Sequence, residues 1–441
     1  MSPPLPLLQH SRDEAILGFH RGRPITVQAF LRDAAGLAGI LPARRHVINL
    51  CSDRYRFTVA LAAALMREQI SLMPPSDVPG VLKALAEKYD LYCLHDGNVP
   101  AIDLPAMAYP HEPFAVSHRV AVPCFPADQP AVTLFTSGSS GEPTPHQKRW
   151  GTLVRSSLAA GLSLGVPHLS NAVVIGTVPQ QHSYGLESTV LLPLQHGLAL
   201  HDAKPFYPSD IIVCLAAVPR PRILVTTPIH LRAILADGEA IPLDLVISAT
   251  APLESRLAAE AEARFAAPLV EIYGCSEAGQ LATRRTAETD EWRCLEAVAL
   301  RQDSGGTIAS GAAVEGEVML SDVIELTGSD RFLLHGRTAD LVNIAGKRTS
   351  LAHLNHHLNS IAGVADGAFI MPEETGTGVT RLMAVVAAPS LSAEAVLAAL
   401  RQRIDPAFLP RPLLLVDRLP RNPLGKLPRE AVVRLAADKR D

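Results

Sequence analysis

The segment richest in groups that could do chemistry is TSGSSG, residues 136–141, which directly follows the apolar run AVTLF. Small hydroxylated residues and glycines let backbone N–H groups point inward and let an anion approach the chain closely. The hydroxyls add further donors, so the composition favours a phosphate cradle. A plain loop after a strand can have the same composition, and the segment matches neither the GxxxxGK[ST] nor the GxGxxG pattern.

Three later segments also contain charged residues that could take part in chemistry. They are EIYGCSEAG (271–279), SDVIEL with HGR (321–337) and RNPLGKLPRE (421–430). With TSGSSGEP, their order and spacing resemble the adenylate-forming superfamily of acyl-CoA synthetases, peptide-synthetase adenylation domains and luciferases. The resemblance covers most of the chain, and four motifs in one order rarely arise by chance.

The resemblance implies ATP and Mg²⁺ as cofactors. In the superfamily the Ser/Gly-rich loop holds the β- and γ-phosphates, and Glu277 stands where a glutamate binds the metal. Mg²⁺ prefers oxygen ligands and bridges phosphates, so a carboxylate suits this task, although outside its motif Glu277 would be interpreted as a surface carboxylate. The implied phosphate-loop residues are Thr136, Ser137, Gly138, Ser139, Ser140 and Gly141.

A nucleoside site and an acid pocket are also implied. Asp322 matches the acidic residue that accepts hydrogen bonds from both ribose hydroxyls, and Arg337 matches a nearby arginine that reaches the ribose. His182 in PQQHSYG resembles a residue that borders the acid-binding pocket. Without the resemblance, Asp322 would be interpreted as a turn cap and His182 as a core histidine. The residues that resemble the adenine walls are Ala249, Thr250, Ala251, Tyr273 and Gly274.

Lys426 in PLGKLPRE matches the superfamily's essential lysine on the small domain. Its ammonium would bind the substrate carboxylate and the α-phosphate, where charge builds as the carboxylate displaces pyrophosphate. In the superfamily the small domain then rotates, which removes this lysine and admits a thiol to the acyl-AMP. We therefore predict that Lys426→Ala abolishes adenylation and leaves ATP binding largely intact.

The chain departs from the superfamily pattern in two places. The phosphate loop is usually followed by GxPKG, whereas GEPTPHQK has Thr144 at the lysine position and Lys148 four residues later. The hinge position after GR usually holds Asp or Lys, whereas here it holds Ala339, followed by Asp340. The role of Lys148 and the identity of the pivot residue are therefore open.

The motifs are set among predicted strands and helices. Apolar runs between residues 172 and 274 alternate with amphipathic segments, which is typical of a parallel sheet covered by helices. These runs are AVVIGTVP, RILVTTP, LDLVISATAP and PLVEIYG. Helical spacing of apolar residues predicts helices in ESRLAAEAEARF, VQAFLRDAAGLAGI and RFTVALAAALMRE.

Short strands and helices alternate in the last hundred residues. We expect helices over 351–360 and 393–403, and strands over 368–371, 383–386 and 412–416. The resulting fold class is α/β, with a large domain of helix-covered, mostly parallel sheets (1–337) joined by a hinge to a small α+β domain (338–441). Three histidines at helical spacing could gather a metal, but a solvated helix face is the simpler interpretation of His353, His356 and His357.

The composition excludes several classes of protein. Hydrophobic residues make up 48% and charged residues 19% of the 441 residues, which is typical of a globular chain. The net charge of -4 argues against a nucleic-acid-binding protein. No apolar run approaches the roughly 20 residues that span a bilayer, the start lacks a signal-peptide pattern, and the six cysteines lack zinc or redox spacing. We expect a cytoplasmic protein without membrane insertion.

The acid and the thiol are less constrained. The phrase EPTPHQKRW and the short length resemble stand-alone AMP-ligases of aryl polyene and xanthomonadin-type pigment pathways, which load a hydroxybenzoic or similar acid onto an acyl carrier protein. Residues 345–441 hold 13 Lys and Arg against 9 Asp and Glu, a net of +4 that suits an acidic carrier protein. The same charge suits coenzyme A, so an acyl-CoA synthetase is one alternative. A catalytically silent adenylate-binding module is another, although such a module has little use for Lys426.

Overall fold

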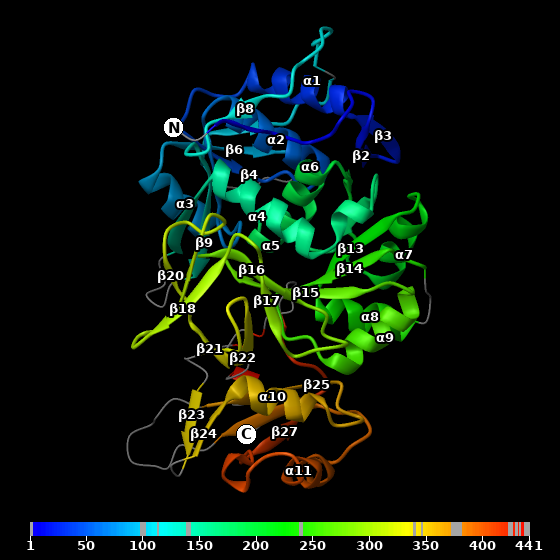
Figure 1. Ribbon diagram of the computed structural model, residues 1–441, viewed down its shortest axis with the longest axis vertical. Coiled ribbons are helices and arrows are strands. Elements are labelled where there is room, and N and C mark those ends of the chain that lie inside the picture. Colours follow the sequence, from blue (N-terminus) through cyan, green and yellow to red (C-terminus); the bar gives the residue numbers. More distant parts are fainter. Residues whose placement is uncertain are drawn as a thin grey trace.

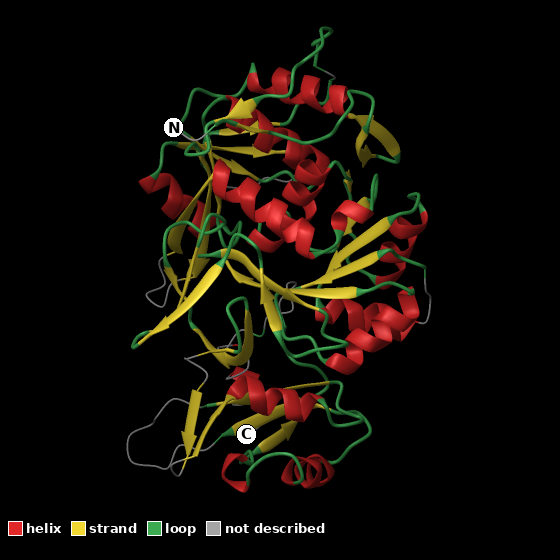
Figure 2. Cartoon of the chain, in the orientation of Figure 1, coloured by secondary structure: helices red, strands yellow, loops and turns green. Residues whose placement is uncertain are grey.

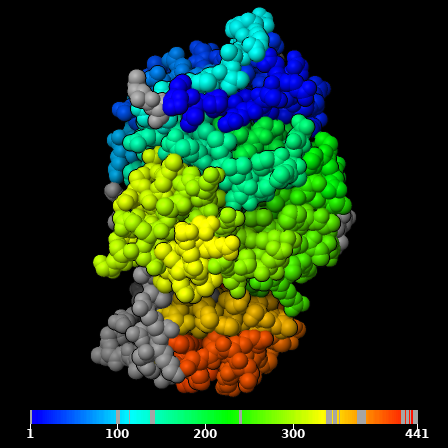
Figure 3. Space-filling view, viewed as in Figure 1, coloured from blue at the N-terminus to red at the C-terminus, as the bar shows by residue number. Residues whose placement is uncertain are grey.

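The computed structural model describes residues 3–97, 103–112, 114–137, 143–237, 241–337, 341–344, 347–371, 382–421, 427, 431 and 434–435. These residues form a large body, coloured blue to yellow, and a smaller C-terminal unit, coloured orange to red (Figure 1). The space-filling view shows the smaller unit beneath the body (Figure 3). Across the described residues, no helix combines the length and apolar character that crossing a membrane requires.

The first large sheet lies in the N-terminal part of the body. Its six described strands follow the order β10-β9-β5-β4-β6-β7, and every pair is parallel except β9–β10. Central strands β4 and β5 are almost wholly buried, as expected for parallel strands with both faces covered. The strands are β4 (His46–Asn49), β5 (Ile70–Met73), β6 (Leu91–His95), β7 (Ala106–Ala108), β9 (Pro130–Ser137) and β10 (Pro143–Arg149).

The second large sheet has eleven described strands in the order β21-β22-β17-β16-β15-β14-β13-β11-β12-β2-β3. It is parallel from β15 to β2 and antiparallel at both ends. The four apolar runs predicted as strands correspond to the adjacent parallel strands β11, β13, β14 and β15. The strands are β2 (Ile16–His20), β3 (Arg23–Thr26), β11 (Val173–Gly176), β12 (Ala199–His201), β13 (Arg222–Thr226), β14 (Leu245–Ser248), β15 (Leu269–Cys275), β16 (Gly279–Arg284), β17 (Trp292–Cys294), β21 (Asp322–Leu326) and β22 (Arg331–Arg337).

Helices separate and cover these sheets (Figure 2). Helix α2 contacts β4 and β5 of the first sheet and β12 of the second, and α4 contacts β10 and β16. Helix α2 is buried from Arg54 to Leu65, as expected for a helix enclosed in a core. The helices of the body are α1 (Val27–Ala38), α2 (Arg54–Met66), α3 (Pro79–Lys88), α4 (Trp150–Ser163), α5 (Ser183–Leu186), α6 (Leu192–His196), α7 (Pro208–Ala216), α8 (Pro228–Asp237) and α9 (Ser255–Phe265), with a π-helical turn at Glu187–Leu191 and a 3-10 turn at Val166–His168.

The three helices predicted in the body are confirmed as α1, α2 and α9. Helix α9 buries Leu257, Ala261 and Phe265, the three residues at helical spacing in its sequence. Two small sheets complete the described body: β1 (Leu5–Pro6) with β8 (Cys124–Phe125), and β18 (Ala299–Asp303), β19 (Gly306–Ser310) and β20 (Val318–Met319).

The C-terminal unit is a small α+β domain with a core of its own, which includes Val342, Leu354, Phe369, Val386 and Leu400. The predicted fold class, with its smaller C-terminal domain, is therefore confirmed. The elements are β23 (Leu341–Ile344), β24 (Lys347–Ser350), α10 (Leu351–Asn359), β25 (Asp366–Ile370), β26 (Met383–Ala387), α11 (Ala393–Arg401), a 3-10 turn (Pro406–Phe408) and β27 (Leu413–Leu415).

Helix α10 lies against the body, and the Ser350 hydroxyl before it donates a 2.6 Å hydrogen bond to the backbone carbonyl of His335. His353 and His356 on this helix are exposed, which agrees with a solvated helix face. The predicted boundary between residues 337 and 338 stays a prediction, because residues 338–340 lie outside the described residues. The two possible pivots, Ala339 and Asp340, fall in that gap.

Candidate active site

The topology of the second sheet indicates where a ligand would bind. Strand β11 lies between β12 and β13, so the connection after β11 runs to one side of the sheet and that after β13 to the other. In open α/β sheets, ligands bind outside the carboxyl ends of the strands where the connections diverge in this way. His182 follows β11 and Ala249 follows β14, while Tyr273 lies near the carboxyl end of β15. These predicted site residues therefore lie at this edge of the sheet.

The predicted metal ligand, Glu277, lies in the turn between β15 and β16. Its side chain is 39% exposed, and its Oε1 lies 3.9 Å from Nε2 of His146 on β10. The same Nε2 lies 2.9 Å from Oγ1 of Thr136 on β9. The fold therefore brings the β9–β10 hairpin, which contains the TSGSSG segment, next to the Glu277 turn.

The donor set here suits a hard cation. The hydroxyl of Thr136 and the carboxylate of Glu277 offer oxygen, and Mg²⁺ sites commonly combine one or two protein oxygens with phosphate oxygens and water. Burial lowers the pKa of His146, which favours a neutral ring beside these oxygens. The residues present therefore fit Mg²⁺ carried with ATP. The side chain of Ser137, and Gly138, Ser139, Ser140 and Gly141, lie outside the described residues.

Two predicted nucleoside residues contact each other. The Tyr273 hydroxyl donates a 2.8 Å hydrogen bond to Oδ2 of Asp322, the first residue of β21. The Tyr273 ring packs against Trp292 and Phe332, with 5.6 Å between ring centroids in each case. This packing fixes the position of the Tyr273 hydroxyl, and the hydrogen bond orients the carboxylate of Asp322. Arg337 lies opposite Asp322 in the β21–β22 register, and its side chain is outside the described part of the chain.

The predicted adenine walls have unusual backbone geometry. Thr250, between Ala249 and Ala251 after β14, has a φ of 80°, a left-handed conformation that is rare for a β-branched residue. Such outliers cluster at functional sites, where the surrounding structure maintains them. A Cβ at Gly274 would lie 2.3 Å from the Gly279 carbonyl oxygen, so this position requires glycine for the close approach of β15 and β16.

The segment that contains His182 is tied to the other sheet. Gln180 donates from Nε2 to the carbonyl oxygens of Cys51 and Ser52, at 3.1 and 3.0 Å, in the loop that follows β4. Gln181 donates to the Cys51 carbonyl at 2.8 Å. His182 itself directly precedes α5. The predicted border of the acid pocket is thus fixed where the carboxyl ends of the two sheets meet.

A further predicted site residue is not placed, and the structure adds candidates that the sequence did not predict. Lys426 lies outside the described residues. Lys148, whose role the sequence leaves open, is 2% exposed and donates from Nζ to the backbone carbonyl of Glu277. Glu187, also buried, was missed together with His146. An acidic residue inside the apolar run LESTVLLPL was the one signal that could have identified Glu187.

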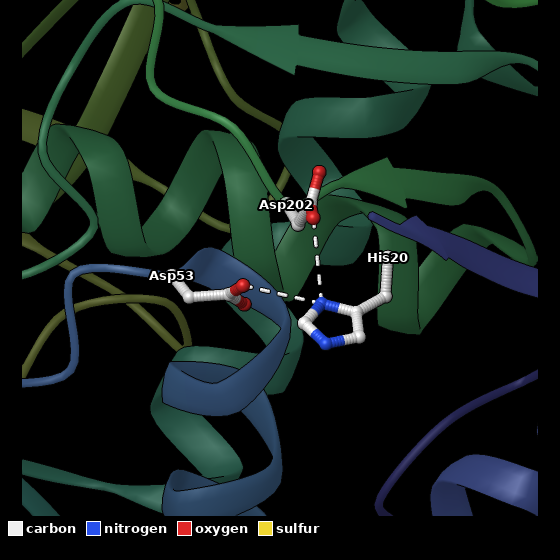
Figure 4. Close-up of side chains that lie close together, drawn as sticks. All are labelled: His20, Asp53 and Asp202. Atoms are coloured by element: carbon white, nitrogen blue, oxygen red, sulfur yellow. Dashed lines mark ion pairs between the residues drawn. The ribbon is translucent and has the colours of Figure 1, made fainter. Parts of the chain in front are cut away.

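A second cluster of titratable residues joins three other elements (Figure 4). His20 at the end of β2 lies with its Nδ1 3.1 Å from Oδ2 of Asp53, the N-cap of α2, and 3.3 Å from Oδ2 of Asp202, which follows β12. The two carboxylates, first Asp202 and then Asp53, raise the pKa of His20 to about 9. This raised pKa favours a protonated ring that pairs with both carboxylates. We interpret the group as a structural ion cluster.

The chain is similar to a known protein family and to several individual proteins. The AMP-binding enzyme family model matches residues 25–308, more than half of the chain. A 4-coumarate–CoA ligase of Rhodobacter capsulatus is 31% identical over 230 residues, 52% of this chain and 57% of its own length. A 4-coumarate–CoA ligase of Halorhodospira halophila is 30% identical over 312 residues, which covers 67% of this chain and 74% of that protein.

A solved structure shows the same fold. It is the o-succinylbenzoate coenzyme A synthetase of Bacillus subtilis in complex with ATP and magnesium ion, with a TM-score of 0.78 and 18% identity, covering 95% of this chain and 96% of that one. The predicted class, an AMP-forming acid–thiol ligase that uses ATP and Mg²⁺, is confirmed at the level of the family. The chain belongs to the AMP-binding enzyme family.

Proposed function

We propose that the chain activates an aromatic carboxylic acid with ATP, releasing pyrophosphate, and then transfers the acyl group from acyl-AMP to a thiol. The observation that carries this proposal is that Thr136 and Glu277 both lie close to the imidazole of His146. Glu277 is in the turn that follows Tyr273. The β9–β10 hairpin of the first sheet thus lies next to the Glu277 turn of the second sheet, which directly follows Tyr273.

Each group has a role in the first step, in which a carboxylate oxygen of the acid attacks the α-phosphorus. A P–O bond to the β-phosphate breaks, and pyrophosphate leaves with the electron pair. Mg²⁺, when bound, neutralises charge on the phosphate oxygens. Glu277 would hold it and the Thr136 hydroxyl would contact a phosphate oxygen, while Tyr273 and Asp322 orient the nucleoside so that the reacting atoms stay in line. Lys426, by its resemblance, balances the charge on the α-phosphate.

An aromatic acid is supported by the names of the two relatives, both 4-coumarate–CoA ligases. We place the acid near the carboxyl ends of β11 and β13. His230 there is 5% exposed, and its Nδ1 lies 2.9 Å from Oγ1 of Thr227 and 3.2 Å from Oγ1 of Thr177. Its Nε2 is buried without a hydrogen-bond partner among the described residues. A ring hydroxyl of the acid would satisfy this atom, because buried polar groups are rarely left unpaired.

The thiol has two candidates. Coenzyme A is favoured by the names of the relatives, which are CoA ligases. An acyl carrier protein, as in the aryl polyene and xanthomonadin-type pathways, is favoured by the net charge of +4 in residues 345–441, because carrier proteins are acidic and complementary charge speeds encounter.

The test uses purified chain, ATP, Mg²⁺ and paired acids that differ only in a ring hydroxyl, such as 4-hydroxybenzoate and benzoate. We expect the hydroxylated member of each pair to have the higher kcat/KM. Products are then separated by chromatography for acyl-CoA and by intact mass for acylated carrier protein. Activity with aliphatic acids alone would contradict the aromatic assignment. Transfer to carrier protein but not to coenzyme A would identify the carrier protein as the acceptor, and the converse result would identify coenzyme A.

A further inference from the structure

Two buried charges lie beside the turn that contains Glu277. Lys148 on β10 is 2% exposed, and its ammonium donates to the backbone carbonyl of Glu277. An ammonium loses several kcal/mol of solvation when it is buried. If Lys148 only filled space, the protein would be more stable with a methionine at this position. Burial lowers the pKa of Lys148, and acidic neighbours, Glu187 first among them, oppose that change.

Glu187 holds the other side of the same turn. It is 5% exposed and opens the π-helical turn between α5 and α6, a distortion that often occurs at functional sites. Its Oε2 accepts a 3.2 Å hydrogen bond from the backbone N–H of Gln280. Gly279, with a φ of 86°, lies under this carboxylate, and a Cβ there would be 3.6 Å from Oε2. Lys148 thus holds this turn at Glu277, and Glu187 holds it where β16 begins.

The same two side chains reach the other predicted site segments. Glu187 Oε1 accepts a 2.6 Å hydrogen bond from the hydroxyl of Ser183, the residue after His182. Lys148 lies on the strand that pairs with the strand of Thr136. Lys148 and Glu187 therefore link the turn of Glu277 to the β9–β10 hairpin and to the segment that contains His182.

We propose that Lys148 and Glu187 are positioning residues that together fix the turn of Glu277, so that its carboxylate is oriented for the Mg²⁺ carried with ATP. This inference rests on the proposed function. It also gives a role to the lysine that stands four residues beyond the position where the superfamily usually has one. Groups that orient a metal ligand typically change metal affinity or activity about 10- to 100-fold when they are removed.

The decisive experiment compares Lys148→Met, Glu187→Gln and the double variant. Each single change leaves one buried charge without its opposite, so both should lower the thermal midpoint. The double variant removes both charges, and paired removal of buried charges often restores stability. We expect its thermal midpoint to return towards that of the unchanged chain, while its Mg²⁺ dependence stays impaired because the carbonyl of Glu277 has lost its donor.

The functional readout is calorimetric ATP binding as a function of Mg²⁺ concentration, which requires no turnover. All three variants should need about tenfold more Mg²⁺ for half-maximal binding. Arg149→Met, on the exposed face of the same strand, is the matched control and should bind like the unchanged chain. Normal Mg²⁺ dependence in the double variant would overturn the positioning role. An unchanged chain whose ATP binding is insensitive to Mg²⁺ would instead overturn the proposed function, and this inference with it.

Discussion

Replacing His20 with asparagine is expected to change how folding stability depends on pH. A pKa raised from 6.5 to about 9 corresponds to about 3 kcal/mol, at about 1.36 kcal/mol per pKa unit. The His20 side chain is 18% exposed, and the side chains of Asp53 and Asp202 are 20% and 12% exposed. Solvent therefore screens the interactions between the imidazolium and the carboxylates. We therefore expect a contribution of about 1–2 kcal/mol to the free energy of unfolding.

The direction of the pH effect follows from the raised pKa. Protonation is favoured in the folded state, so the contribution is fully present below the unfolded value of about 6.5 and is lost as pH rises through about 9. Urea unfolding, followed by tryptophan fluorescence, measures it. The difference in unfolding free energy between the unchanged chain and His20→Asn should shrink by about 1–2 kcal/mol between about pH 6.5 and about pH 9.5.

His168→Asn is the control, because His168 is exposed in the turn after α4. This variant shows how much of the effect follows from replacing an exposed histidine. A difference for His20→Asn that stays constant from pH 6.5 to 9.5 would refute the ion-cluster interpretation. So would stoichiometric Zn²⁺ that raises the thermal midpoint of the unchanged chain but not of Asp202→Asn, because the cluster would then be a metal site.

Two further predictions concern the nucleoside residues. Tyr273→Phe removes the 2.8 Å hydrogen bond to Asp322, which should lower the free energy of unfolding by about 1–2 kcal/mol and weaken ATP binding in calorimetry. Tyr207→Phe, at an exposed tyrosine, should change neither quantity. At Thr250, where φ is 80°, glycine should be more stable than alanine by about 1 kcal/mol in urea unfolding, since only glycine adopts this conformation without strain. Equal stability of the two variants would show that the conformation relaxes when the side chain is removed.

Much of the fold could be predicted because its signals are local. The parallel strands β11, β13, β14 and β15 are continuous apolar runs, and α9 has apolar residues at helical spacing. The antiparallel strands β17 and β21 were missed. Strand β17 has three residues and β21 leaves most of its side chains partly exposed, so neither has a clear apolar pattern.

The residues of the candidate site also differ in whether the sequence could predict them. Glu277 and Asp322 were identified from motifs that resemble a known superfamily. Lys148 and Glu187 could not be, because their roles depend on burial and on contacts between distant segments. Lys148 contacts a carbonyl 129 residues away, and Glu187 accepts from a backbone N–H 93 residues away. No pattern of spacing in the sequence predicts either contact.

We propose that the chain forms acyl-AMP where the Thr136 hairpin lies next to the Glu277 turn that follows Tyr273. Acid-dependent exchange of labelled pyrophosphate into ATP measures this step directly. We predict exchange with aromatic acids by the unchanged chain and by Glu296→Gln, an exposed control, and a loss of at least about tenfold in Glu277→Gln. Absence of exchange across a broad panel of acids, by a folded chain that binds ATP, would contradict the claim and leave a silent adenylate-binding module.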